Sequence, residues 1–134
     1  MTQRKSEQEA GATDPEYEEF TRARALQEAG QLKEAEEILL DLVGGEYAFG
    51  AQLALGTVLL EQEKAEEAVS LMARLVETYP ESESVSLLLF HSLWMAQRRE
   101  EAFLEMKRFL ADHESWEYRR LRSDLKREGY LVPS

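Results

Sequence analysis

The stretch EKAEEAVSLMARL, residues 63–75, carries the pattern that decides the fold of this chain. Its apolar residues recur at intervals of three and four, which is typical of an amphipathic α-helix. The same pattern occurs earlier as GQLKEAEEILLDL (30–42) and later as QRREEAFLEMKRF (97–109). The alanines of the three segments, Ala35, Ala68 and Ala102, are separated by 33 and 34 residues. Three aligned segments at one period indicate an internal repeat built from helices.

Helix start and stop signals extend this pattern over most of the chain. Asp14 favours a helix start because its side chain can cap the first turn, and Pro15 suits the first helical position. Gly30 favours a helix end. No segment alternates as a half-buried strand does, and the short connections favour antiparallel neighbours. Seven helices are predicted, at about 15–29, 32–43, 48–62, 64–78, from Ser82 or Ser84 to 95, 99–112, and 115–128.

The repeat resembles the tetratricopeptide repeat family. The second copy carries the resemblance through Leu55-Gly56, Leu59, Ala68, Met72 and Pro80, whose order and spacing fit the family pattern. Leu59 and Met72 stand where the family usually has aromatics. The resemblance implies an all-α fold, a right-handed α-α superhelix of three helical hairpins with a C-terminal capping helix. We expect a flexible polar tail at 1–13, a repeat domain at 14–114 with repeats at about 16–48, 49–82 and 83–114, and the capping helix and tail at 115–134.

The other two copies depart from the family pattern. Where the second copy has Leu55-Gly56, the first has Arg22-Ala23 and the third has Leu89-Phe90. Phe90 falls where the family has a small residue that allows two helices to approach closely. We therefore expect either that the third helix pair is splayed or that its register differs by one residue.

Composition and charge exclude several classes of function. The chain has 134 residues, formal net charge −11 and no cysteine, which excludes disulfides and thiolate chemistry. The acidic balance argues against nucleic acid and anionic membranes as partners. The apolar run SLLLFHSLWM (86–95) is too short to span a bilayer, and the chain is expected to be cytoplasmic and not inserted in membranes. His91 and His113 lie on different predicted helices without a nucleophile or a metal-binding motif, so we expect no enzyme activity, no metal and no cofactor.

The resemblance also implies where partners bind. In this family the first helix of each repeat lines the concave surface. Trp94 and Met95 are expected there, and neither is expected to be needed to close its own helix pair. The predicted set is unusually apolar for a surface, which favours a partner-binding groove. Its members are Tyr17, Phe20, Arg24, Leu53, Thr57, Leu60, Leu87, His91, Trp94 and Met95.

Two functions remain open from these observations. The first is a non-catalytic protein–protein interaction module that binds an apolar peptide or an amphipathic helix. In size, acidity and repeat number the chain resembles the small chaperones of bacterial type III secretion, which implies a chaperone or an assembly adaptor. The alternative is a structural homo-oligomer, for example a homodimer, that uses the same apolar surface. The C-terminal helix could also cover the groove, since Trp116, Tyr118, Leu121 and Leu125 are predicted to form its apolar side.

Overall fold

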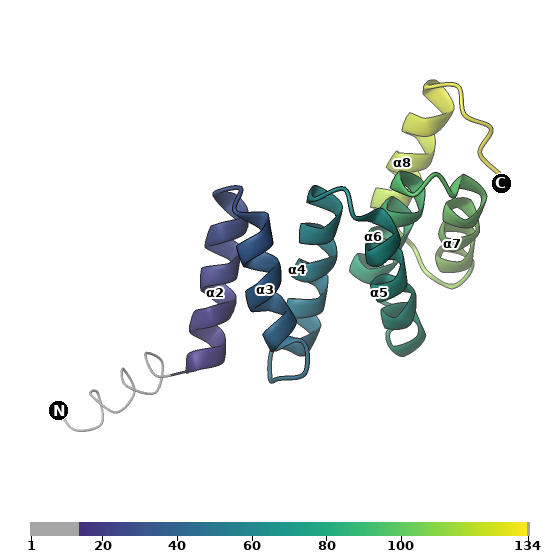
Figure 1. Ribbon diagram of the computed structural model, residues 1–134. Coiled ribbons are helices and arrows are strands. Elements are labelled where there is room, and N and C mark those ends of the chain that lie inside the picture. The colour runs from purple at the N-terminus through teal and green to yellow at the C-terminus, as the bar shows by residue number, and fades with distance from the viewer. Residues whose placement is uncertain (1–13, 134) are drawn as a thin grey trace. The chain divides into compact units, whose positions relative to one another are not determined.

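All secondary structure in the part of the chain that the structure describes is helical (Figure 1). The computed structural model describes residues 14–133, and no strand occurs among them. The predicted all-α class is therefore confirmed for these residues, while the tail predicted at 1–13 lies outside them. The helices are α2 (Pro15–Glu28), α3 (Leu32–Leu42), α4 (Ala48–Glu61), α5 (Ala65–Thr78), α6 (Glu83–Met95), α7 (Arg99–Asp112) and α8 (Trp116–Arg127).

Three helices begin with the side-chain caps that their sequences favour. The backbone N–H of Tyr17 donates to Asp14 Oδ1 at 3.1 Å, and that of Tyr118 donates to Ser115 Oγ at 3.0 Å. At α6 the cap is Ser82, whose Oγ accepts from Val85 N at 3.3 Å. Each cap satisfies one of the N–H groups that a helix start leaves without an intrahelical partner. The predicted starts of α2, α6 and α8 are confirmed.

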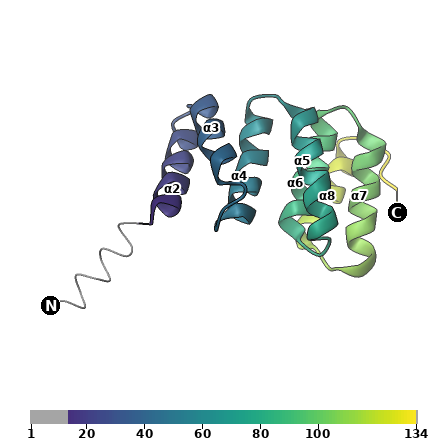
Figure 2. The same ribbon diagram turned by 60° about the horizontal axis from the view of Figure 1, so that its bottom comes forward.

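The described residues group into two compact units, one up to Gln62 and the other from Glu63 onward. In the N-terminal unit, α3 packs on both α2 and α4, and α2 also touches α4. In the C-terminal unit, α6 packs on both α5 and α7, and α8 lies beside α6 and α7 (Figure 2).

The repeated alanines are buried, as the period predicts. Ala35, Ala68 and Ala102 are all fully shielded from solvent. The residues four positions later, Leu39, Met72 and Met106, are buried as well. An alanine and a larger apolar residue at this spacing lie on one face of a helix, one turn apart. The apolar stripe that defines the repeat is therefore the core-facing side of α3, α5 and α7.

A turn with left-handed backbone recurs at the same place in every repeat. Gly30, Glu63 and Gln97 each precede the second helix of a repeat and have φ of 81°, 63° and 66°. Gly129, just after α8, has φ of 97°. Such values suit glycine and are uncommon for other residues, which indicates that the turn is fixed by the surrounding fold. The left-handed turn after α8 therefore matches the turn that follows the first helix of each repeat.

Phe90 is accommodated without a change of register. It is buried, and its ring lies 6.2 Å from Phe103 of α7 and 5.9 Å from Tyr118 of α8, measured between centroids. Helices α6 and α7 still pack on each other, and the left-handed turn follows at Gln97, the position that the repeat predicts. The expectation of a splayed pair or a shifted register is therefore wrong. The aromatic ring fills space between α6, α7 and α8.

Candidate protein-binding surface

Six of the predicted groove residues lie in the N-terminal unit, where α2 and α4 touch. We call them the α2–α4 surface: Tyr17, Phe20 and Arg24 on α2, with Leu53, Thr57 and Leu60 on α4. None of them is fully buried, and Tyr17 is 53% exposed. The residues of α4 recur at intervals of four and three, so they share one face of the helix. Apolar side chains on that face remain partly accessible to a partner.

Tyr47 and Gly50 organise the aromatic end of this surface, and neither was predicted as a functional residue. The ring of Tyr47 lies 6.0 Å from that of Tyr17 and 6.4 Å from that of Phe20. A Cβ atom at Gly50 would lie 3.4 Å from Phe20 Cζ, an ordinary van der Waals distance, so Phe20 packs on the start of α4 at this position. Tyr47 lies in the loop before α4, outside the helical periodicity that guided the prediction.

A hydrogen bond fixes the orientation of the Tyr47 ring. The Tyr47 hydroxyl donates to Asp14 Oδ2 at 2.7 Å. This bond, with a smaller effect of lost hydration, raises the pKa of Tyr47 to about 12. It also holds the pKa of the Asp14 carboxyl below its ordinary value, assisted by the backbone N–H of Tyr17. One aspartate therefore caps α2 and anchors the aromatic ring beside it.

Polar contacts close the α2–α4 surface at both ends. At one end the Glu16 carboxylate lies over the loop before α4, accepts from Glu46 N at 3.3 Å and occupies the space that a side chain at Gly45 would need. At the other end Gln27 Nε2 donates to Glu61 Oε1, which joins α2 to α4. The apolar middle of the surface thus lies between two hydrogen-bonded ends.

The remaining four predicted residues lie on α6 in the C-terminal unit. Leu87 is partly exposed, and Met95 is 45% exposed. His91 is exposed as a whole, yet neighbouring side chains displace water from part of its ring, and this lowers its pKa. These three residues are open to solvent as a binding role requires.

Trp94 is more enclosed than the sequence predicts. Its ring centroid lies 5.7 Å from that of Phe103 on α7 and 5.0 Å from that of Tyr130, which follows α8. The Arg99 guanidinium carbon lies 5.1 Å from the ring centroids of both Trp94 and Tyr130. Trp94 therefore contacts its own helix pair through Phe103, as well as the segment after α8. Self-coverage by the C-terminal segment, one of the alternatives left open, occurs at this residue.

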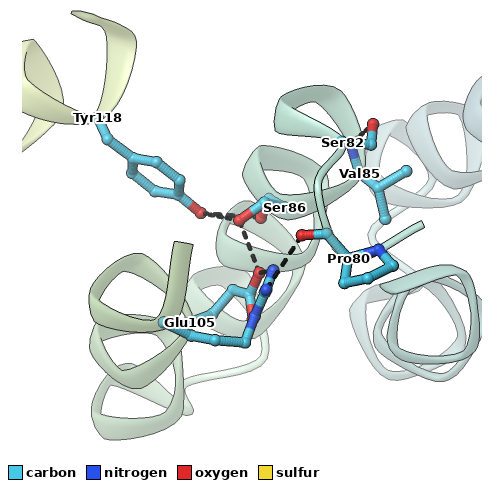
Figure 3. A network of polar contacts seen from close by, with 7 residues as sticks. Pro80, Ser82, Val85, Ser86, Glu105 and Tyr118 are labelled. Atoms are coloured by element: carbon cyan, nitrogen blue, oxygen red, sulfur yellow. Dashed lines mark hydrogen bonds and ion pairs between the residues drawn. The ribbon is translucent and has the colours of Figure 1, made fainter. Parts of the chain in front are cut away.

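A buried polar network fixes α8 to the C-terminal unit (Figure 3). Ser86 Oγ donates to Glu105 Oε2 at 2.6 Å, and the Tyr118 hydroxyl lies 2.8 Å from Ser86 Oγ and 3.0 Å from its carbonyl oxygen. Arg108 holds the Glu105 carboxylate with two hydrogen bonds of 2.8 and 2.7 Å and donates to Pro80 O at 3.0 Å. Burial raises the pKa of Tyr118, which keeps its proton available for Ser86. The network joins α6, α7, α8 and the loop before α6.

The apolar side predicted for α8 is right in part. Tyr118 and Leu125 are buried and Leu121 is half-buried, whereas Trp116 is 70% exposed. Residues two apart on a helix point about 200° apart, so Trp116 and Tyr118 cannot both face the core. Trp116 is therefore a surface residue, and the prediction that it packs inward is wrong.

Between residues 14 and 133, no group of three or more histidine and acidic side chains is placed to hold a metal ion. No helix in the same range is long and apolar enough to cross a membrane.

Comparison with known families gives a match at residues 51–82 to the tetratricopeptide repeat. The matched segment falls within the second predicted repeat, at 49–82, and contains Leu55-Gly56, Ala68 and Pro80, on which the resemblance rested. No curated protein and no solved structure matched the chain. Residues 51–82 therefore form a segment similar to a tetratricopeptide repeat, and the helical period and the recurring turn agree with this similarity.

Proposed function

We propose that the chain is a non-catalytic interaction module that binds an apolar peptide or an amphipathic helix of a partner protein. A tetratricopeptide repeat suggests protein partners. The observation that carries the proposal is the α2–α4 surface, where apolar side chains stay partly exposed between two hydrogen-bonded ends. Contiguous apolar surface with a polar rim is typical of interaction sites.

The chemistry of the α2–α4 surface favours an apolar ligand over a charged one. Arg24 is the only charged member of the set, and Thr57 Oγ1 already donates to Leu53 O at 3.2 Å. Side chains on one face of an amphipathic helix would lie against Phe20, Leu53 and Leu60. In the C-terminal unit, Leu87, His91 and Met95 on α6 form a separate candidate surface, whereas Trp94 would first have to lose its contact with Tyr130. We propose that this module acts as a small chaperone or an assembly adaptor, like those of type III secretion.

Titration with a model amphipathic helix tests the proposal. The probe is an 18-residue peptide of leucine and glutamine, and its binding is measured by calorimetry. We expect Tyr17→Ser and Leu53→Ser each to weaken binding at least fivefold, because apolar anchors dominate such interfaces. Leu40→Ser is the matched control, since Leu40 is 51% exposed on α3, outside the proposed surface, and should change affinity less than twofold.

The results distinguish partner binding from the alternative. Equal losses for Leu40→Ser and Leu53→Ser would contradict the assignment of the surface. The mass of the intact protein is measured in parallel across a range of concentrations. A dimer that becomes a monomer on Tyr17→Ser would show that the surface serves self-association.

A further inference from the structure

The outward face of α8 has an exposed tryptophan with an arginine stacked on it. Trp116 begins the helix and is 70% exposed. Arg120 lies one turn later, with its guanidinium carbon 5.5 Å from the centroid of the Trp116 ring. Tryptophan and arginine are the residues most enriched among those that dominate binding energy at protein interfaces. The stacking also holds the guanidinium in place before any ligand arrives.

The charges of α8 oppose those of the chain as a whole. Its five basic residues face only two acidic ones, Glu117 and Asp124, in a chain of net charge −11. Two of the five are already neutralised, because Arg119 pairs with Glu114 at 2.5 Å and Arg127 pairs with Asp124. Within residues 14–133, Arg120 forms no ion pair with a carboxylate, so the stacked guanidinium retains its hydrogen-bonding capacity.

The opposite side of α8 holds this face rigidly. Tyr118 and Leu125 are buried, and the Tyr118 hydroxyl is bonded to Ser86 on α6. A shallow cleft of about 270 Å³ opens on the outward side, lined by Trp116, Glu117, Arg120, Leu121 and Asp124. Leu121 is half-buried and gives the cleft an apolar floor. The face thus combines one available cation with an aromatic ring and an apolar surface.

We propose that Trp116, Arg120 and Leu121 form a docking site for an acidic segment of a partner protein. A carboxylate of the segment pairs with the Arg120 guanidinium, and an adjacent apolar side chain packs on Trp116 and Leu121. One planar cation suits one carboxylate, which it can hold through two hydrogen bonds. The exposed tryptophan with its stacked arginine is typical of protein interfaces and favours a protein over a nucleic acid or a membrane, and the single arginine of the cleft suits one carboxylate better than a row of phosphates. This site is on α8 and does not depend on the α2–α4 surface.

Two-dimensional NMR of the full chain tests the site with a defined probe. The probe is a 12-residue peptide of alternating glutamate and leucine, and its matched control has glutamine in place of glutamate. We expect the glutamate peptide to shift the Trp116 indole signal saturably and to bind at least fivefold more tightly than the control peptide. Trp116→Ala and Arg120→Gln, followed through the backbone amides of α8, should each weaken binding at least fivefold. Arg127→Gln is the matched control, because Asp124 already neutralises Arg127, and should change affinity less than twofold.

Each outcome of this experiment decides the proposal. No saturable shift at Trp116, or equal binding of the two peptides, would overturn it. Tighter binding of a single-stranded oligonucleotide or of phosphatidylserine vesicles than of the peptide would show that the ligand is not a protein. Loss of a dimer in Arg120→Gln would show that the ligand is a second copy of the chain. Arg120→Gln alters an exposed side chain and keeps the test valid if Trp116→Ala folds poorly. Tyr17→Ser should leave the Trp116 shift intact, which separates this site from the α2–α4 surface.

Discussion

Removal of the Tyr118 hydroxyl measures what the buried polar network contributes to the docking of α8. The single proton of Ser86 Oγ goes to Glu105, so the Tyr118 hydroxyl must be the donor toward Ser86. Tyr118→Phe removes that donor and leaves an acceptor site of Ser86 unfilled in a fully buried residue. A buried hydrogen bond contributes about 0.5–1.5 kcal/mol net, and an unsatisfied group adds to the loss. Because Ser86 stays bonded to Glu105, we expect the free energy of unfolding to fall by about 1–2 kcal/mol.

Tyr118→Ala should cost more, because it also removes the packing of the ring. The Tyr118 ring lies 5.9 Å from that of Phe90 and 5.8 Å from that of Phe109, and the residue is fully buried. Truncation of a buried aromatic costs about 3–5 kcal/mol. The difference between the two variants, about 2 kcal/mol or more, is the packing contribution of the ring.

Urea denaturation followed by circular dichroism measures both variants. Tyr17→Phe serves as the control, since Tyr17 is 53% exposed and loss of an exposed hydroxyl should change stability by less than about 0.5 kcal/mol. If Tyr118→Phe were as stable as the unchanged chain, the network would not contribute to stability. A loss below about 1 kcal/mol for Tyr118→Ala would show that α8 does not depend on this residue for its position.

Two further predictions concern the turns and the acid stability. Gln97→Gly should raise the free energy of unfolding by about 0.5–1 kcal/mol. Relief of the left-handed conformation contributes about 1–2 kcal/mol, and the added freedom of the unfolded chain costs about 0.4–1 kcal/mol. Urea denaturation measures the change, and an equal gain for Gln97→Ala would contradict this explanation. The pKa of Asp14 is lowered in the fold, mainly by the Tyr47 hydroxyl, so its contribution to stability is present above its ordinary pKa near 4 and is lost as the pH falls through the lowered value. Thermal unfolding between pH 6 and pH 2 should therefore show a smaller loss for Asp14→Asn than for the unchanged chain, and identical pH profiles would exclude this role.

Local signals made the fold predictable from the sequence. The caps at Asp14 and Ser115 and the period of Ala35, Ala68 and Ala102 depend only on neighbouring residues along the chain, and the structure places all of them as expected. Phe90 shows the limit of this reasoning, because the space that accepts its ring is made by two other helices.

The candidate sites depend on contacts that the sequence does not encode locally. Tyr47 reaches Asp14 across 33 residues, and the enclosure of Trp94 follows from the path of the chain after Gly129. The position of Trp116 could have been deduced, since a residue two positions before Tyr118 must face the other side of the helix.

The left-handed turns have a consequence for how a chain of this kind changes length. Gly30, Glu63, Gln97 and Gly129 mark it at intervals of 33, 34 and 32 residues. A duplication or deletion between two of these positions carries one complete pair of helices and leaves the flanking turns intact, whereas a break of any other length places a helical residue where the backbone must reverse. A change in length by one whole repeat therefore keeps every left-handed turn in its place. Gly129 is a ready junction at which a further helix of the α5 or α7 type could be joined.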